Sequence, residues 1–232
     1  MLGIELKGHD YKYEIAELFK LFTTQFKFIK EDEKFEKTLI NEFIKDEDYI
    51  KSTTKYYENN DLKLCKEEVF NINSFNEEEI KKKSKTIIKR SIFKVLSELY
   101  DTYVPWGILT GIRPVKIVHS LLDEGLSEVE IRQNLKDNYL IKDEKIDLAL
   151  DIAKRERVFI YPIDKNKISL YVSIPFCPTR CVYCSFPSNP MKQFGHLREN
   201  YVKAIVKEIK GLAKLLKETN KEIETLYIGG GT

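Results

Sequence analysis

Three cysteines lie within eight residues of one another: Cys177, Cys181 and Cys184, in the spacing C-x3-C-x2-C. Thiolate sulfur is the soft ligand that the iron of iron–sulfur clusters prefers. Three thiolates on one loop can serve three of the four irons of a cubane cluster. The fourth iron is then open to a small molecule, as a catalytic metal site requires.

Other uses of these cysteines remain open at this point. A disulfide would pair two of them and strand the third, and the sequence does not suggest an oxidising compartment. A structural zinc ion needs four ligands, and the nearest further candidates are His196 and the distant Cys65. Free buried thiols are a third alternative. The spacing favours the cluster over these readings.

The segments around the cysteines predict how they are positioned. Apolar residues alternate with polar ones before the loop, at Ile168, Leu170, Val172 and Ile174, which is the period of a strand. After the loop, apolar residues recur at helical spacing at Phe194, Leu197, Tyr201, Ala204, Ile205, Ile209, Leu212 and Leu216. Residues 223–228 are then predicted to form a second strand, which runs into Gly229-Gly230-Gly231-Thr232. This order predicts a βαβ unit with both loops at the carboxyl ends of parallel strands, where ligands bind.

The three consecutive glycines permit a close approach of the backbone to a ligand. A glycine run at a strand end is weak evidence alone, since it also fits an ordinary tight turn. Its place one βα unit after the cysteine loop strengthens the functional interpretation.

The cysteine motif together with YIGGGT resembles the radical S-adenosylmethionine (SAM) superfamily. The longer phrase Y-x-S-I-P-F-C-x3-C-x-Y-C-S-F, from Tyr171 to Phe186, is similar to the oxygen-independent coproporphyrinogen III dehydrogenases, and within them to the HemZ-type branch. The phrase PWGILTGIRPVK, from Pro105 to Lys116, also resembles that branch.

This resemblance implies a [4Fe–4S] cluster held by the three motif cysteines, with SAM on the open iron. It implies that Tyr183 lies near the adenine and that Gly229, Gly230, Gly231 and Thr232 meet the methionyl amino group. We expect Tyr171 and Ser173, on one face of the first strand, to point toward SAM and the substrate.

The reaction that the resemblance implies starts with one electron passed from the cluster to SAM. The resulting 5′-deoxyadenosyl radical takes hydrogen from a propionate of the tetrapyrrole, and loss of CO2 and an electron leaves a vinyl group. A flavodoxin- or ferredoxin-like donor would supply electrons. Well-studied members carry histidine at the position of Ser173 and cysteine at that of Phe186. A haem-chaperone relative also has phenylalanine there, so haem binding or delivery is the alternative function.

Composition bounds these expectations. The chain has 232 residues, 42% hydrophobic and 33% charged, which is typical of a globular protein. Its 39 basic and 37 acidic residues argue against a general electrostatic attraction to nucleic acid. No apolar run is long enough to span a membrane and no secretory signal is visible. Few cysteines, three of them clustered, indicate a reducing cytoplasmic setting.

The preceding residues, 1–165, are expected to form an accessory α+β domain with a short antiparallel sheet. Residues 38–44, 49–57 and 62–70 are expected to form an antiparallel meander, and residues 2–7 a further short strand. The expected helices are 11–22, 76–100, 114–123, 127–138 and 142–160. Cys65 is expected to be a small core or face residue of the last strand.

Local signals support several of these helices. Asn76 is a candidate N-cap, and Ser127 with Glu130 has the capping-box pattern. The lysine run beginning at Lys81 is interpreted as a solvated helix face rather than a nucleic-acid patch. Residues 104–114 are interpreted as a rigid turn with Pro114 at the first helical position. The alternatives are a docking surface against the barrel, or a contact from Arg113 to a substrate carboxylate.

Residues 162–167 are the expected seam, followed by residues 166–232 as the first βαβ unit of an incomplete (β/α) barrel. A barrel needs about 200 residues or more, so we expect an N-terminal fragment of a longer enzyme. A single βαβ unit leaves apolar faces uncovered, and we expect residues 167–232 to be poorly stable alone.

Overall fold

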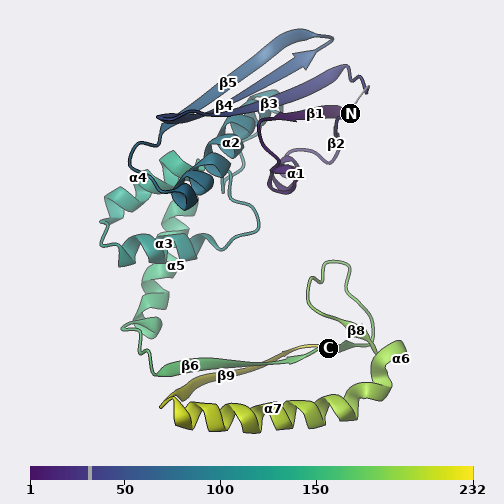
Figure 1. The fold of residues 1–232 in the computed structure, drawn as a ribbon, viewed down its shortest axis with the longest axis vertical. Coiled ribbons are helices and arrows are strands. Elements are labelled where there is room, and N and C mark those ends of the chain that lie inside the picture. The colour runs from purple at the N-terminus through teal and green to yellow at the C-terminus, as the bar shows by residue number, and fades with distance from the viewer. Residues whose placement is uncertain (31–32, 232) are drawn as a thin grey trace. The chain divides into compact units, whose positions relative to one another are not determined.

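The computed structural model describes residues 1–30 and 33–231 of the chain. It divides the chain into two compact units, with the boundary between Phe159 and Ile160. Each unit has its own strands and helices (Figure 1). The described part of the chain is therefore α/β in class, and the two units are taken in turn.

Unit 1 is built on a five-stranded sheet in the order β2-β1-β3-β4-β5. Its strands are β1 (Leu2–Lys7), β2 (Phe26–Phe28), β3 (Lys37–Lys45), β4 (Tyr49–Glu58) and β5 (Asp61–Asn71). The expected meander is confirmed for β3, β4 and β5, which pair antiparallel. The expected short strand at residues 2–7 is β1, which pairs parallel with both β2 and β3, so the sheet as a whole is mixed rather than antiparallel.

The parallel pairs follow from the connections of β1. Neighbouring antiparallel strands are joined by tight turns, whereas a parallel pair needs a crossover of a dozen or more residues. The chain leaves β1 at Lys7 and enters β3 only at Lys37, passing through helix α1 (Lys12–Phe19) and β2. That length allows β3 to return in the same direction as β1, and the sheet becomes mixed.

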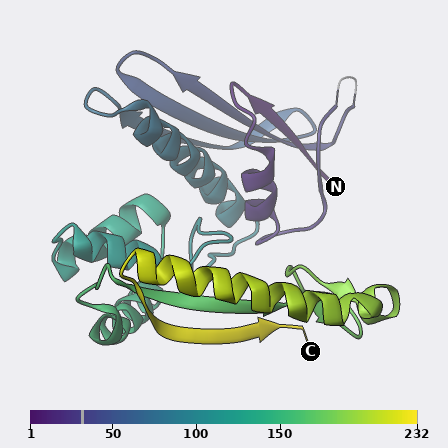
Figure 2. The same ribbon diagram turned by 60° about the horizontal axis from the view of Figure 1, so that its bottom comes forward.

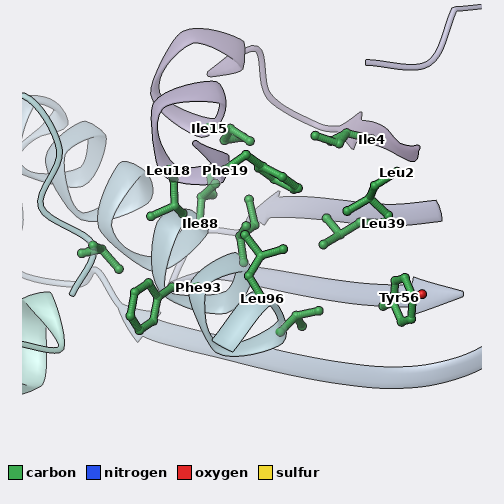
Figure 3. Close-up of a cluster of buried hydrophobic side chains, with 13 residues drawn as sticks. Leu2, Ile4, Ile15, Leu18, Phe19, Leu39, Tyr56, Ile88, Phe93 and Leu96 are labelled. Atoms are coloured by element: carbon green, nitrogen blue, oxygen red, sulfur yellow. The ribbon is translucent and has the colours of Figure 1, made fainter. Parts of the chain in front are cut away.

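One face of this sheet packs against α1 and the long helix α2 (Glu77–Leu99). Alternate residues of β4 are buried, beginning with Ile50 and ending with Tyr56, as the period of a strand requires. Figure 3 shows one buried cluster that combines side chains of the strands, among them Leu39, with Phe19 of α1 and Phe93 of α2. The largest buried cluster of unit 1 therefore lies between the sheet and the two helices.

A buried polar network ties α2 to the middle of the sheet. The side-chain nitrogen Nδ2 of Asn41 in β3 lies 2.7 Å from Thr54 Oγ1, 3.0 Å from Ser52 Oγ and 3.2 Å from Ser91 Oγ, and its two hydrogens are shared among these hydroxyl oxygens. His9 Nε2 lies 2.8 Å from the side-chain oxygen Oδ1 of Asn41. Burial lowers the pKa of His9 despite this hydrogen bond. The side chains of this network thus have partners, which keeps the cost of burying them small.

Some lysines of α2 lie on a solvated face of the helix, and others are partly buried. Lys82 pairs with Glu78 at 2.9 Å and Lys85 pairs with Glu14 at 2.5 Å, as the interpretation of paired surface charges expects. Lys83 and Lys89 differ, because burial lowers the pKa of both. Lys83 donates to Asn138 Oδ1 at 3.0 Å, so this lysine joins α2 to a later helix.

Three helices complete unit 1: α3 (Pro114–Asp123), α4 (Glu128–Tyr139) and α5 (Asp143–Ile160). Pro114 stands at the first helical position, as the sequence predicts. Ser127 and Glu130 form the expected capping box at the start of α4. The three helices enclose a second buried cluster that includes Val118, Leu135 and Leu150.

Unit 2 has the expected order of strand, cysteine loop, helix and strand. Its elements are β6 (Lys167–Ile174), β7 (Phe176–Cys177), β8 (Asn189–Pro190), α6 (Met191–Phe194), the 3-10 turn η1 (Gly195–Leu197), α7 (Arg198–Glu218) and β9 (Glu222–Gly230). The strands β6 and β9 pair parallel. Figures 1 and 2 both show α7 running along this pair, as in a βαβ unit.

Unit 2 differs from unit 1 in burial. Every described residue of 160–231 is at least partly exposed, whereas unit 1 holds the three buried clusters. Large apolar side chains such as Val202 of α7 and Leu226 of β9 are more than half exposed, at 58% and 59%. None of the helices in residues 1–30 and 33–231 is long and apolar enough to cross a lipid bilayer.

Candidate metal and cofactor site

The parallel pair β6–β9 brings the cysteine loop and the glycine run to one edge of the sheet. Ser173 pairs with Gly229, and Ile174 pairs with Gly230. Because both strands run in the same direction, both loops leave the sheet at the same end. Two motifs separated by more than forty residues of chain are therefore neighbours in space.

The cysteine loop is closed at its base. Cys177 in β7 pairs with Pro190 in β8, and the Asn189 amide donates to the Pro175 carbonyl at 2.7 Å. Between these points the Cys184 amide donates to the Cys181 carbonyl at 3.0 Å, which forms a tight turn. The loop thus places three cysteines on one short, closed segment.

All three thiols are free, with Cys181 exposed and Cys177 and Cys184 half-buried. Disulfide pairing within the motif is therefore absent from this structure. Among the residues described, no three His, Cys, Asp or Glu side chains converge closely enough to hold a metal ion. The donors still fit an iron–sulfur cluster in number and chemistry, since three uncrosslinked thiols stand on one accessible loop. Cys65 is exposed on β5 of unit 1.

The glycine run is needed for a close backbone approach. Gly230 has φ of +115°, and a Cβ there would lie 2.5 Å from the Ile174 carbonyl oxygen. A Cβ on Gly231 would lie 2.0 Å from the Phe176 carbonyl oxygen. The Gly231 amide also donates to the Ile174 carbonyl. These glycines therefore let the end of β9 lie directly against the entry of the cysteine loop, which no other residue type allows.

The other residues predicted to belong to the site lie on β6, on the cysteine loop and at the end of the chain. Tyr171 and Ser173 share a face of β6, as their spacing predicts, and Ser173 is directly opposite Gly229. Tyr183 is 90% exposed on the cysteine loop, and its predicted contact with an adenine stays a prediction. Thr232 lies outside the described residues.

Two tyrosines that the sequence interpretation did not assign also belong to this region. Tyr201 of α7 donates its hydroxyl to the Ser173 carbonyl at 2.5 Å, and its ring meets Phe176 edge-on. Tyr227 of β9 stacks on Tyr171. Tyr227 could have been found from the period of β9, which puts it on the same face as Gly229. The contacts of Tyr201 with Ser173 and Phe176 depend on how α7 packs against β6. No sequence period predicts that packing.

Comparison with known proteins adds homology over part of the chain. This chain is 39% identical over 130 residues to the oxygen-independent coproporphyrinogen-III oxidase-like protein HemZ of Bacillus subtilis. The match covers 55% of this chain and 26% of that protein. The chain is 33% identical over 66 residues to the heme chaperone HemW of Escherichia coli, covering 28% of this chain and 16% of the relative. With the oxygen-independent coproporphyrinogen III oxidase of Salmonella typhimurium it shares 34% identity over 82 residues, covering 35% and 17%.

These homologues confirm the resemblance that the cysteine and glycine motifs indicate, to the radical SAM family of HemZ, HemW and oxygen-independent coproporphyrinogen III oxidase. The matched segment spans about a quarter of HemZ and less of the other two. No family model matches the chain, and no solved structure matches it.

Proposed function

We propose that Cys177, Cys181 and Cys184 hold a [4Fe–4S] cluster that binds SAM, in an oxidoreductase that decarboxylates coproporphyrinogen III without oxygen. A small one-electron donor of the flavodoxin or ferredoxin type would reduce the cluster in a reducing cytoplasm. The observation that carries the proposal is the placement of three free thiols beside the glycine run, at the carboxyl end of a parallel strand pair. Homology to proteins with these names supports the substrate class.

Each motif has a separate task in this proposal. The three thiols bind iron, and the backbone of Gly229–Gly231 with Thr232 receives the methionyl end of SAM. Tyr183 lies against the adenine, and Tyr171 and Ser173 face SAM and the tetrapyrrole. When bound, the cluster and SAM supply one-electron chemistry that removes a hydrogen atom from a substrate propionate.

A second candidate is a protein that binds or delivers haem while keeping the cluster and SAM site. The HemW relatives favour it, and Phe186 in the cysteine loop is compatible with both functions. The exposed Tyr183 and Phe186, at 90% and 61%, would offer aromatic contacts to a planar ring in either case.

The first test is anaerobic reconstitution with iron and sulfide, followed by metal analysis and EPR of the reduced protein with and without SAM. We expect about four irons per chain and a SAM-dependent change of the EPR signal. Cys181→Ser should lose the cluster, because one of its three protein ligands is removed. Cys65→Ser is the matched control, since this cysteine lies in unit 1, and it should bind iron as the parent does.

The outcomes separate the alternatives. Zinc without iron, or equal iron in Cys181→Ser and the parent, would overturn the cluster assignment. With the cluster present, the protein is next incubated with coproporphyrinogen III, SAM and a reductant, and separately titrated with haem. Release of CO2 supports the oxidoreductase, whereas stoichiometric haem binding without CO2 release supports the second candidate.

A further inference from the structure

Tyr171 and Tyr227 form a stacked pair on one face of the parallel strands. They are direct register partners of β6 and β9. Their ring centroids lie 5.3 Å apart and their planes differ by 13°. Both side chains remain open to ligands, since the residues are 51% and 65% exposed. The pair is therefore an ordered feature of an accessible surface.

Both rings lie over Gly229. A Cβ on Gly229 would be 2.7 Å from Tyr227 Cε1 and 3.1 Å from the Tyr171 hydroxyl oxygen. The two tyrosines thus fill the space that any side chain at position 229 would need. The Tyr171 hydroxyl is held beside the first glycine of the run, and it has no hydrogen-bond partner among residues 1–30 and 33–231. Its proton is free for an acceptor on a bound ligand.

The same face carries a neighbouring pair that is independent of the rings. Thr225 donates its hydroxyl to Ser169 Oγ at 2.7 Å. These two residues are also register partners, and each lies two residues before its tyrosine. Without a neighbour, the ring of a half-exposed tyrosine on a strand has more than one staggered χ1 position available. A parallel aromatic neighbour on the next strand favours the stacked position over the others.

We propose that Tyr227 is a positioning residue, which holds Tyr171 in one rotamer so that its hydroxyl is presented to the ligand at the glycine run. The inference rests on the proposed function for the identity of that ligand, which is SAM. It adds a residue of β9 to the site and gives it a task that does not require contact with the ligand.

The experiment measures the dissociation constant of SAM by isothermal titration calorimetry on the reconstituted full chain. Tyr227→Leu removes the ring and should weaken binding by about two- to tenfold, the size of one aromatic pair. Tyr227→Phe keeps the ring and should bind as the parent does. Thr225→Val removes the neighbouring hydrogen bond on the same face and should also leave binding unchanged.

A double substitution separates positioning from direct contact. In Tyr171→Phe the hydroxyl is gone, so adding Tyr227→Leu should weaken binding no further. Parent-like binding by Tyr227→Leu, equal weakening by Tyr227→Phe, or full additivity with Tyr171→Phe would overturn the inference.

A second measurement does not depend on SAM. The Hα–Hβ couplings of Tyr171, measured by NMR, should report one rotamer in the parent and in Tyr227→Phe, and averaged rotamers in Tyr227→Leu. Unchanged couplings in Tyr227→Leu would refute the positioning role even if the parent binds no SAM. Absence of SAM binding by the parent, with these couplings as expected, would instead count against the proposed function.

Discussion

At the scale of single residues, Lys89 of α2 has an unusual environment for an ammonium group. Its Nζ donates to Thr110 Oγ1 at 3.0 Å. Burial lowers the pKa of Lys89 to about 8, while the Glu14 carboxylate raises it and the Lys85 ammonium lowers it further. Desolvation outweighs the attraction of the carboxylate. The Lys89 ammonium therefore loses its proton at a lower pH than the ammonium of a free lysine.

We expect Lys89 to titrate near pH 8, whereas Lys82 should titrate above the usual lysine range because its hydrogen bond to Glu78 raises its pKa. The measurement is a pH titration by NMR of the protein with 13C-methylated lysines, with Lys89→Arg used to assign the signal. A Lys89 signal that titrates together with that of Lys82 would contradict the expectation.

The lowered pKa of Lys89 also has a consequence for stability. Between about pH 8 and the unperturbed value of 10.5, the unfolded state binds more protons at this residue than the folded state. The contribution of Lys89 to the free energy of unfolding therefore rises with pH across that window. Below about pH 8 both states carry the proton and the cost of burying the charge is fully present.

At the scale of elements, α2 depends on the cap at its first turn. The Asn76 side-chain oxygen accepts a hydrogen bond from the Glu79 backbone N–H at 3.0 Å. In return, the Glu79 carboxylate accepts one from the Asn76 backbone N–H at 2.9 Å. Both directions of the capping box are present, and three acidic residues in the first turn suit the positive end of the helix dipole. This helix packs on the sheet of unit 1 and contributes side chains to its largest buried cluster. Loss of the cap should therefore affect the stability of unit 1.

Asn76→Ala should lower the free energy of unfolding of unit 1 by about 1 kcal/mol, because the helix start loses its side-chain acceptor. Urea unfolding followed by the fluorescence of Trp106, the only tryptophan and a residue of unit 1, measures the change. Asn76→Ser keeps an acceptor and should remain close to the parent. Equal midpoints for the alanine and serine variants would show that the cap does not stabilise α2.

At the scale of the whole molecule, the two units differ in how much they bury. Unit 1 encloses three clusters of buried apolar residues, and the described part of unit 2 encloses none. Burial of apolar area is the main favourable term in folding, at about 25 cal/mol per Å². The cooperative stability of this chain should therefore reside in unit 1.

Hydrogen exchange tests this difference. Amides in β6, β9 and α7 should exchange faster than those in the middle of α2 and β4 by several orders of magnitude, because local opening exposes them at little cost. Mass spectrometry of the labelled protein gives both rates in one sample. Protection in residues 167–230 equal to that of α2 would refute the expectation and show that unit 2 is as stable as unit 1 within this chain.

Local signals in the sequence were sufficient for many features of this protein. The helices α3, α4 and α5, the caps of α2 and α4, the meander β3–β4–β5 and the βαβ order around the cysteines all follow from periods and turn residues over a few positions. The cysteine motif that carries the family resemblance is also local, because its three thiols lie on one short loop.

Long-range pairing was decided only by the tertiary structure. The parallel place of β1 in the sheet, the contact of Gly231 with the cysteine-loop entry and the stack of Tyr227 on Tyr171 join residues far apart in the chain. The burial of Lys89 among apparently solvated lysines is of the same kind. A sequence period gives the face on which a side chain lies, but strand register and helix docking determine which other side chain it meets there.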